Sequence, residues 1–225
     1  MKESILIHPL SDSNSVRDES FFTGHAFSAS SPETADEVRQ VILCCAAHGI
    51  TITPHGGLTG INGAGTATNN HSMNLQHLTG VSYRAKDNTL WALAGTTFSE
   101  IETSVRKESN MTREFPASPT EKSATIGGAL SFGARGLRSY KYGSVSDFVT
   151  ELEYCDCNGN LHLCSASDSN FHDLLGSEGM LGIITGVRIR TSPIPKFLWG
   201  LMFFFPDSLC AAGFADAVKS IEHIS

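Results

Sequence analysis

The apolar positions between residues 38 and 45 recur with the period of an α-helix that buries one face. This stripe comprises Val38, Val41, Ile42 and Cys45. Ser31 and Pro32 predict the start of the helix, as its N-cap and its first helical residue, and Gly49 predicts its end. Residues 25–28 and the β-branched run 50–53 predict one strand on each side of the helix. This order describes one βαβ unit.

Beyond residue 80 the pattern is that of a mixed fold. A threonine at position 96 or 97 caps a predicted helix that runs to Lys107. Asn158-Gly159 is typical of a two-residue hairpin turn. The predicted strands are 90–95, 150–157, 160–164 and 187–190, the last alternating strictly as a half-buried strand does. We therefore expect a mixed α+β fold, and the length of 225 residues allows either one large domain or two lobes.

Composition and pattern also suggest where the chain divides. Residues 1–20 are polar and serine-rich without a period, so we expect a loose leader there. The apolar run 197–205 predicts a strand, and 208–221 predicts a helix. The expected units are a main domain over 21–196, with lobes of about 21–82 and 83–196, and the first strand and helix of a truncated further domain over 197–225.

The overall composition narrows the class of protein. The 16 Lys and Arg residues against 23 Asp and Glu give a net charge of −7, which argues against a nucleic-acid binder that acts through bulk positive charge. A hydrophobic fraction of 40% with 17% charged residues fits a packed globular protein. The six cysteines lack the dense spacing of a disulfide framework, and the first residues lack an apolar signal core. We therefore expect a cytoplasmic protein with no membrane-spanning segment.

Most of the glycines fall in three short stretches, 56–65, 127–143 and 176–186. The first directly follows a predicted strand that Pro54 is expected to end. Glycines there let backbone N–H groups converge on one point, which makes a site for an anion such as a pyrophosphate. The alternative is a tight connection without a ligand. Neither a P-loop nor a Gly-x-Gly-x-x-Gly spacing is present.

The second stretch adds hydroxyls and positive charge. Four hydroxyl residues and three cations belong to it: Ser118, Thr120, Ser123, Thr125, Arg135, Arg138 and Lys141. Together they could complete a diphosphate cradle or attract a carboxylate. A solvated basic helix end is the alternative for the cations. The third stretch places small residues before two aliphatic ones, which suits a flat ring lying against the backbone.

These motifs, taken in order and spacing, resemble the FAD-binding (PCMH-type) domain of the vanillyl-alcohol oxidase superfamily. The motifs are Pro54-x-Gly-x-x-Thr-Gly60, Pro119-Thr120 with Thr125-Ile-Gly-Gly128, Tyr142-Gly143, and Gly176-Ser-Glu-Gly-x-Leu-Gly-Ile-Ile-Thr185. The resemblance covers roughly residues 21–196. Within the superfamily, the sequence looks most like the branch of FAD-linked 2-hydroxy-acid dehydrogenases, such as D-lactate dehydrogenase and the glycolate oxidase flavin subunit.

The resemblance implies an α+β fold of two lobes, a small βαβ lobe and a larger lobe built on a mixed or antiparallel sheet, with FAD between them. Residues 55–60 would wrap the pyrophosphate, residues 119–125 and 132–135 would hold the rest of the diphosphate and the flavin side, and residues 178–184 would contact the cofactor through their backbone. The implied cofactor-binding residues are Pro54, His55, Gly56, Gly57, Leu58, Thr59, Gly60, Pro119, Thr120, Ser123, Thr125, Gly127, Gly128, Phe132, Gly133, Ala134, Arg135, Glu178, Gly179, Gly182, Ile183 and Ile184.

Three positions bear on how tightly and in what way FAD is held. Members of this branch often carry Arg where His55 stands and Gly where Leu58 stands, so the phosphate charge is less well matched here and the loop is less free. Thr59 occupies the place of the histidine that attaches flavin covalently in other superfamily members. We therefore expect non-covalent FAD. Flavin fluorescence that stayed with the denatured chain on a gel would contradict this.

The resemblance implies an enzyme that takes a hydride from a 2-hydroxy acid of the D-lactate or glycolate type. Its substrate residues would lie mostly in a C-terminal cap domain, so no catalytic residue is assigned in this chain, which is expected to need that domain or a redox partner. An alternative on the same scaffold is a flavin-dependent reductase of the enolpyruvyl sugar type. A further alternative is a truncated FAD-binding module without turnover.

A cluster of cysteines and a histidine in the predicted hairpin has ligand types that suit a metal ion, but its spacing favours packing on a sheet face. A two-residue turn at Asn158-Gly159 would place Cys155, Cys157, His162 and Cys164 on one face of a hairpin. Sulfur and imidazole are zinc ligands, but residues two apart on a strand lie roughly 7 Å apart, far for a tetrahedral site. We expect sheet-face packing and no metal.

Overall fold

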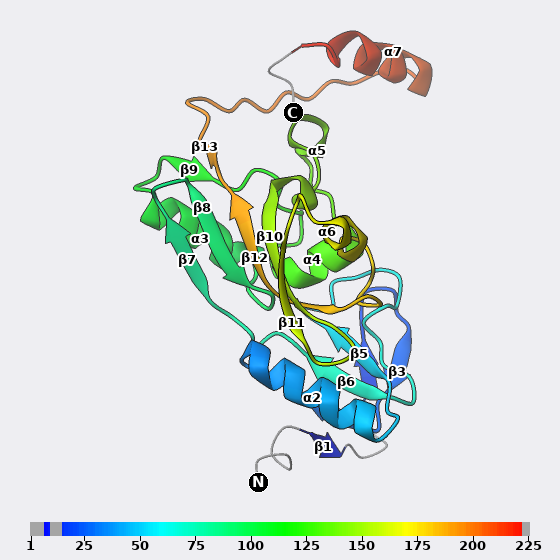
Figure 1. The fold of residues 1–225 in the computed structure, drawn as a ribbon. Coiled ribbons are helices and arrows are strands. Elements are labelled where there is room, and N and C mark those ends of the chain that lie inside the picture. Colours follow the sequence, from blue (N-terminus) through cyan, green and yellow to red (C-terminus); the bar gives the residue numbers. More distant parts are fainter. Residues whose placement is uncertain (1–6, 10–14, 222–225) are drawn as a thin grey trace.

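Two β-sheets form the centre of the molecule and share one hydrophobic core (Figure 1). The computed structural model describes residues 7–9 and 15–221. The smaller sheet lies toward the N-terminal end in Figure 1, and the larger one occupies the middle of the molecule. The α+β fold expected from the pattern, and the two lobes that the resemblance implied, are confirmed.

The smaller sheet is the predicted βαβ unit with two additions. Its order is β1-β4-β6-β5, with β4 and β5 parallel to β6 between them and β1 antiparallel. Helix α2 connects β4 to β5 and buries the predicted stripe of Val38, Val41, Ile42 and Cys45. The bounds are β1 (His8–Pro9), β4 (Ser28–Ser30), α2 (Ala35–Ala47), β5 (Ile52–His55) and β6 (His71–Asn74).

Both ends of this unit differ in detail from the prediction. Thr34, not Ser31, is the N-cap of α2, and its side chain accepts from the Glu37 amide at 3.2 Å. Asp36 and Glu37 then lie in the first turn, where carboxylates are favourable. Strand β5 runs through Pro54 to His55 instead of ending at the proline. It is an edge strand, where the missing N–H can be tolerated.

The larger sheet is antiparallel throughout, in the order β11-β10-β12-β8-β7. Its middle strand, β12, begins four residues before the predicted strand, and its first five residues are buried, with α4 (Ile126–Phe132) packed against it. The predicted alternation over residues 187–190 is confirmed, since Val187 and Ile189 are buried while Arg188 and Arg190 are not. The bounds are β7 (Val81–Arg84), β8 (Thr89–Leu93), β10 (Val149–Cys155), β11 (Leu161–Ser165) and β12 (Ile183–Arg190).

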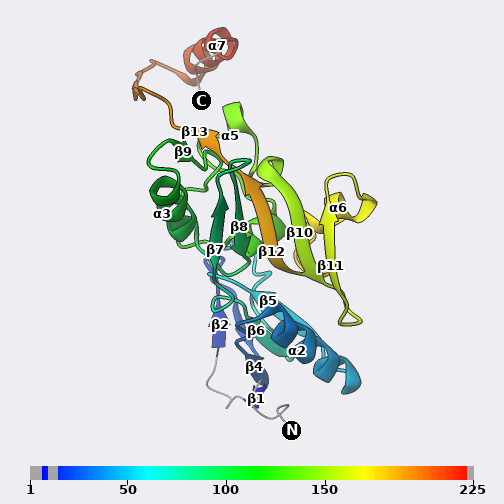
Figure 2. The ribbon, with the colours of Figure 1, turned by 60° about the vertical axis from the view of Figure 1, so that its left-hand side comes forward.

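The helices and short strands complete the lobes (Figure 2). Thr97 and Glu100 form a full capping box at the start of α3, which confirms the predicted threonine cap. The larger sheet begins at Val81, close to the lobe boundary expected at about residue 82. The remaining elements are α3 (Phe98–Glu108), β9 (Arg113–Glu114), α4 (Ile126–Phe132), α5 (Ser139–Tyr142), η1 (Val145–Phe148), α6 (Ser169–Leu174) and β13 (Ser192–Pro193), which pairs with β9.

The hairpin between β10 and β11 has a longer loop than its Asn-Gly pair predicted. Cys155 pairs with Leu161 and Tyr154 with His162, which leaves residues 156–160 in the loop. The Asp156 carboxylate accepts from the amides of Asn158 and Asn160, both at 2.9 Å, and this holds the wider turn. The register therefore puts Cys155 and His162 on opposite faces, so the predicted shared face was wrong.

The described part of the supposed leader is packed against the rest of the chain. Strand β1 joins the smaller sheet, and β2 (Ser15–Arg17) pairs with β3 (Thr23–His25). The Asp18 side chain is buried, with 4% exposure of the residue. The expectation of a loose segment therefore fails for the described residues, while 1–6 and 10–14 lie outside them.

The apolar run 197–205 forms no strand. Its large side chains are mostly exposed, including Trp199 at 82% and Phe204 at 88%. No strand of the described chain pairs with it, and an extended segment without a neighbour cannot form a ladder. The predicted helix follows as α7 (Ser208–Val218), set apart from the sheets together with this run (Figure 2).

Candidate functional site

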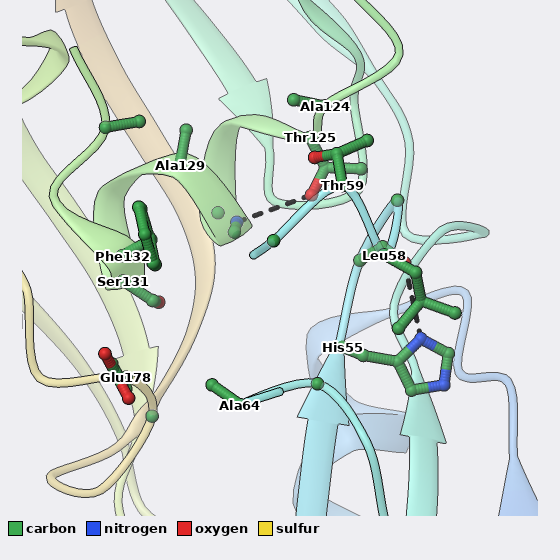
Figure 3. A pocket seen from close by; sticks show the side chains of 18 of the residues that line it. His55, Leu58, Thr59, Ala64, Ala124, Thr125, Ala129, Ser131, Phe132 and Glu178 are labelled. Carbon is green, nitrogen blue, oxygen red and sulfur yellow. Dashed lines mark hydrogen bonds between the residues drawn. The ribbon is translucent and has the colours of Figure 1, made fainter. Parts of the chain in front are cut away.

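A cavity of about 350 Å³ lies where the end of β5, the start of α4 and the loop before β12 meet. All three glycine-rich stretches contribute to its wall, although more than 100 residues separate the first from the last. Figure 3 shows the loop after β5 facing Ser131, Phe132 and Glu178 across the space. The close convergence of these stretches is the feature on which the sequence interpretation depended.

Of the predicted cofactor-binding residues, all but Ser123 and Gly133 line this cavity. The Ser123 hydroxyl instead donates to the Glu121 carboxylate at 2.7 Å, and Gly133 is the left-handed C-cap of α4, with a φ of +77°. Residues that line the cavity but were not predicted are Asp18, Ile61, Asn62, Ala64, Gly65, Leu75, Ala94, Glu121, Ala124, Ala129 and Ser131.

Most of these missed residues are neighbours of predicted ones, so extending each motif by a few positions would have found them. Ile61, Asn62, Ala64 and Gly65 lie in the second half of the first glycine stretch, and Ala124, Ala129 and Ser131 lie within or beside the second. Asp18 is different because it comes from the segment interpreted as a leader, 36 residues before Pro54. Only the tertiary structure brings it to the cavity.

The loop after β5 presents a row of unsatisfied backbone donors. The carbonyl of His55 still accepts from the Leu75 amide at 2.8 Å. From Gly56 to Gly60, by contrast, no backbone N–H has an acceptor within the described part of the protein. Successive N–H groups left open beside a cavity form a concave donor surface, and such surfaces bind anionic oxygens.

The conformation of this loop depends on an unfavourable backbone angle. Leu58 has a φ of +54°, in the left-handed region that favours glycine. Its side chain packs over Gly65, where a built Cβ would lie 3.0 Å from Leu58 Cδ2. Leu58 therefore holds a left-handed backbone conformation that glycine would adopt without strain. This is the position at which the resemblance implied a less free loop.

Two glycines let the first and second stretches touch. A Cβ at Gly56 would lie 2.1 Å from Thr125 Oγ1, and one at Gly57 would lie 2.7 Å from the Ser123 carbonyl oxygen. Thr125 also caps α4, accepting from the Gly128 amide at 3.4 Å (Figure 3). The absence of side chains at 56 and 57 therefore sets the distance between two walls of the cavity.

The third stretch forms the opposite wall. Glu178 and Gly179 both have positive φ, +53° and +81°, which turns the chain sharply before β12. A Cβ at Gly182 would lie 2.8 Å from the Tyr154 ring, so the wall packs directly on strand β10. Ile183 and Ile184, both buried, then complete the apolar part of the lining.

His55 lies in the cavity wall as a neutral side chain. Its Nδ1 donates to the Gly56 carbonyl at 3.3 Å, and its Nε2 accepts from the Ser72 hydroxyl at 3.1 Å. Burial lowers its pKa below the ordinary value of 6.5, despite the opposing effect of the bond to Gly56. At neutral pH it therefore contributes no positive charge to an anion.

The three cations of the second stretch lie in different places, and only one of them lines the cavity. Arg135 lines the cavity, whereas the Arg138 guanidinium is paired with the Glu114 carboxylate at 2.6 Å and lies over the Tyr142 ring. Lys141 is exposed on α5 and does not line the cavity. Arg135 is thus the one Arg or Lys among the lining residues. A bound diphosphate would be neutralised mainly by backbone N–H dipoles.

The described residues form neither a metal-ion cluster nor a membrane-spanning helix. Over 7–9 and 15–221, no three His, Cys, Asp or Glu side chains come together in a group that could hold a metal ion. In the same part of the chain, no helix has both the length and the apolar character needed to cross a bilayer.

The fold and the cavity define an α+β domain with a donor-lined cleft for a dinucleotide. The donor set fits FAD on three counts. Residues 56–60, whose amides have no acceptor among the described residues, line the cavity and could donate to phosphate oxygens. Glycines remove side chains where the two lobes meet, and Ile183 and Ile184 offer an apolar surface to a ring. The geometry of the cavity is therefore compatible with bound FAD.

Comparison with known proteins agrees with this fit. The family model described as FAD binding domain matches residues 29–165. D-lactate dehydrogenase from Anaerostipes hadrus is 28% identical over 178 residues, which is 75% of this chain and 37% of that protein. The mitochondrial D-2-hydroxyglutarate dehydrogenase of Rattus norvegicus is 32% identical over 185 residues, 73% of this chain and 32% of that one. This chain therefore spans well under half the length of these relatives.

A solved structure supports the fold independently. 6-Hydroxy-D-nicotine oxidase from Arthrobacter nicotinovorans superimposes with a TM-score of 0.74 at 15% identity, over 84% of this chain and 42% of that one. The chain belongs to the FAD binding domain family, and its cofactor is FAD. The resemblance read from the four motifs is confirmed.

Proposed function

We propose that this chain is the flavin-holding part of an oxidoreductase that acts on a 2-hydroxy acid of the D-lactate or glycolate type. FAD would accept a hydride from the hydroxyl-bearing carbon while a base takes the hydroxyl proton. The relatives named above carry such substrates in their names, and the motifs match that branch. The chain covers only part of each relative, so the substrate rests on this analogy.

The observation that carries the proposal is the row of amides from Gly56 to Gly60 beside the cavity, for which the described residues supply no acceptor. In our proposal, these donors hold the diphosphate, with the Thr59 and Thr120 hydroxyls beside them. Residues 119–135 hold the remainder of the cofactor, and the backbone of residues 178–184 supports the flavin ring. Ser123 and Gly133 stay in this set only as residues that shape its loops.

We assign the positioning of the hydroxy acid to a C-terminal cap domain or a redox partner beyond the FAD-binding domain of residues 21–196. Residues 197–225 would supply the start of such a domain. A cytoplasmic location and non-covalent FAD belong to the same proposal. Thr59 provides no nucleophile of the histidine type for a covalent flavin bond, and the cavity offers no other histidine than His55 among its lining residues.

The first test is the visible absorbance spectrum of the purified chain, before and after incubation with FAD. We expect the bands of oxidised flavin, which should be lost from the protein after denaturation and filtration. Colourless protein that took up no FAD would overturn the proposal. Flavin that remained with the denatured chain would overturn the non-covalent part alone.

The second test adds D-lactate or glycolate without oxygen to the flavin-loaded protein and to the longest natural form of the chain. Bleaching of the flavin by the hydroxy acid supports the dehydrogenase function. Bleaching only by NADPH would point to a reductase of the same fold. FAD binding without bleaching by any donor, in the longest form, would identify a binding module without turnover.

A further inference from the structure

A buried carboxylate reaches the phosphate-binding loop from a distant part of the sequence. Asp18 follows β2, is 4% exposed and lines the cavity. Its Oδ2 accepts from the Gly63 amide at 2.9 Å. The next residue, Glu19, donates its own amide to the Gly60 carbonyl at 3.0 Å. Two adjacent residues therefore hold both ends of the segment 60–63.

The other oxygen of the same carboxylate also accepts hydrogen bonds. Asp18 Oδ1 accepts from the Ser20 amide at 3.0 Å and from the Ser20 hydroxyl. Three donors thus converge on two oxygens that can only accept. An asparagine has the same shape but would turn one acceptor into an N–H₂ donor, which would face either Gly63 N–H or Ser20 N–H. The position requires a carboxylate on hydrogen-bonding grounds.

Electrostatics alone would favour the opposite residue. A negative charge beside a cleft for a diphosphate repels its ligand, and Arg135 is the only Arg or Lys among the lining residues. Removing the Asp18 charge should therefore tighten binding if the side chain has no other role. The hydrogen bonds of Asp18 to Gly63 and Ser20 would oppose this effect by holding the loop in place.

We infer that Asp18 is a positioning residue that fixes the 60–63 end of the glycine-rich loop and so aims the open amides of residues 56–60 at the diphosphate. The inference rests on the proposed function of the cavity. It names a contribution from the N-terminal hairpin to cofactor affinity, through Gly63 and Gly60, with no contact between Asp18 and the flavin required.

The experiment measures FAD and ADP affinity of the full chain and of Asp18→Asn, by quenching of flavin fluorescence and by calorimetry. We expect the dissociation constants of FAD and ADP to rise about tenfold or more, since an N–H left without an acceptor is costly. Riboflavin, which lacks the diphosphate, should be affected much less. Asp173→Asn removes the same charge from an exposed position away from the cavity and should change nothing.

A second readout does not need the cofactor. Amide hydrogen exchange of residues 60–63 in the cofactor-free Asp18→Asn protein should be faster than in the unmodified chain. Ser20→Ala, which removes one donor to Oδ1, should weaken FAD binding in the same direction by a smaller factor, and it decides the matter if Asp18→Asn does not fold.

Unchanged or tighter FAD binding in Asp18→Asn, or in Ser20→Ala where only that variant folds, would overturn the inference. If the unmodified chain bound neither FAD nor ADP, the proposed function would fail instead. In that case, hydrogen exchange at residues 60–63 that is slower or unchanged in Asp18→Asn would still contradict the positioning role of Asp18. The two failures can therefore be told apart.

Discussion

Asn62 Nδ2 donates a hydrogen bond of 2.9 Å to Glu178 Oε1, joining two walls of the cavity that lie 116 residues apart in sequence. Both side chains are exposed at the rim. The Asn62 Oδ1 atom also accepts from the Ala64 amide at 3.2 Å, which orients the side chain toward the opposite wall. Among the residues that the structure describes, this is the one side-chain hydrogen bond between the loop after β5 and the loop before β12.

Breaking this link should speed the release of FAD. A solvent-exposed hydrogen bond contributes about 0.5–1 kcal/mol, so Asn62→Ala should raise the dissociation rate of FAD about two- to fivefold, measured by fluorescence recovery after dilution. Glu178→Gln keeps an acceptor oxygen and should have a smaller effect.

The matched control is Gln40→Ala, which removes an exposed amide hydrogen bond to Asp36 on α2, far from the cavity. It should leave the release rate unchanged. An equal change in the control and in Asn62→Ala would show that the rim bond does not hold the walls together.

Gly56→Ala should separate the first two glycine stretches. The added Cβ would lie 2.1 Å from Thr125 Oγ1, so the loop or α4 must shift. Overpacking of this kind costs about 1–3 kcal/mol, which urea unfolding should detect as a lower free energy of unfolding together with weaker FAD binding. Gly200→Ala, where a Cβ meets nothing within 4 Å, is the control and should be neutral.

At Leu58, a glycine replacement should give a more stable protein than an alanine replacement, which is the reverse of the usual order of stability. Both remove the contact with Gly65, but only glycine accepts the φ of +54° without strain. Leu58→Gly should therefore be more stable than Leu58→Ala by about 1 kcal/mol in thermal or urea unfolding. An alanine variant at least as stable as the glycine variant would mean that the loop relaxes out of the left-handed region.

Stability should fall on mild acidification because of a buried histidine. His71 is fully buried in β6 between the Ser28 and Ser30 hydroxyls, each 2.8 Å from a ring nitrogen. Burial lowers its pKa from 6.5 to about 4. Between these values the unfolded chain binds a proton that the folded chain does not, so the stability present above pH 6.5 is lost as the pH falls toward 4.

The full contribution of His71 corresponds to about 3 kcal/mol. The free energy of unfolding, measured in urea at several pH values between 7.5 and 4.5, should decrease more steeply for the unmodified chain than for His71→Gln. His77→Gln replaces an exposed histidine and should keep the steep dependence. Parallel curves for all three proteins would contradict the role of His71.

Local interactions explain where the sequence predicted well. The stripe of α2 and the Thr97–Glu100 capping box depend on residues within one or two turns, so the pattern alone locates them. Local competition explains two of the errors. Thr34 outcompetes Ser31 as the N-cap, and the Asp156 side chain widens the turn that Asn158-Gly159 would have closed.

The strand predicted at 197–205 failed for a different reason. Its composition suits a strand, but a strand is stable only beside another one, and no described strand lies there. Strand β12 shows both cases. The alternation at residues 187–190 follows from the local pattern, whereas the full burial of residues 183–187 depends on packing that includes α4.

By itself, the sequence determined the glycine-rich motifs, their order and hence the family and the cofactor, because a backbone that must approach a ligand closely requires glycine at fixed spacings. Only the tertiary structure decided which side chains complete the site. Asp18 belongs to the cavity wall and accepts a hydrogen bond from the Gly63 amide, whereas Arg138 pairs with Glu114 and does not line the cavity. Such contacts join residues distant in sequence, and they exist only once the sheets have packed and the chain has brought their donors and acceptors together.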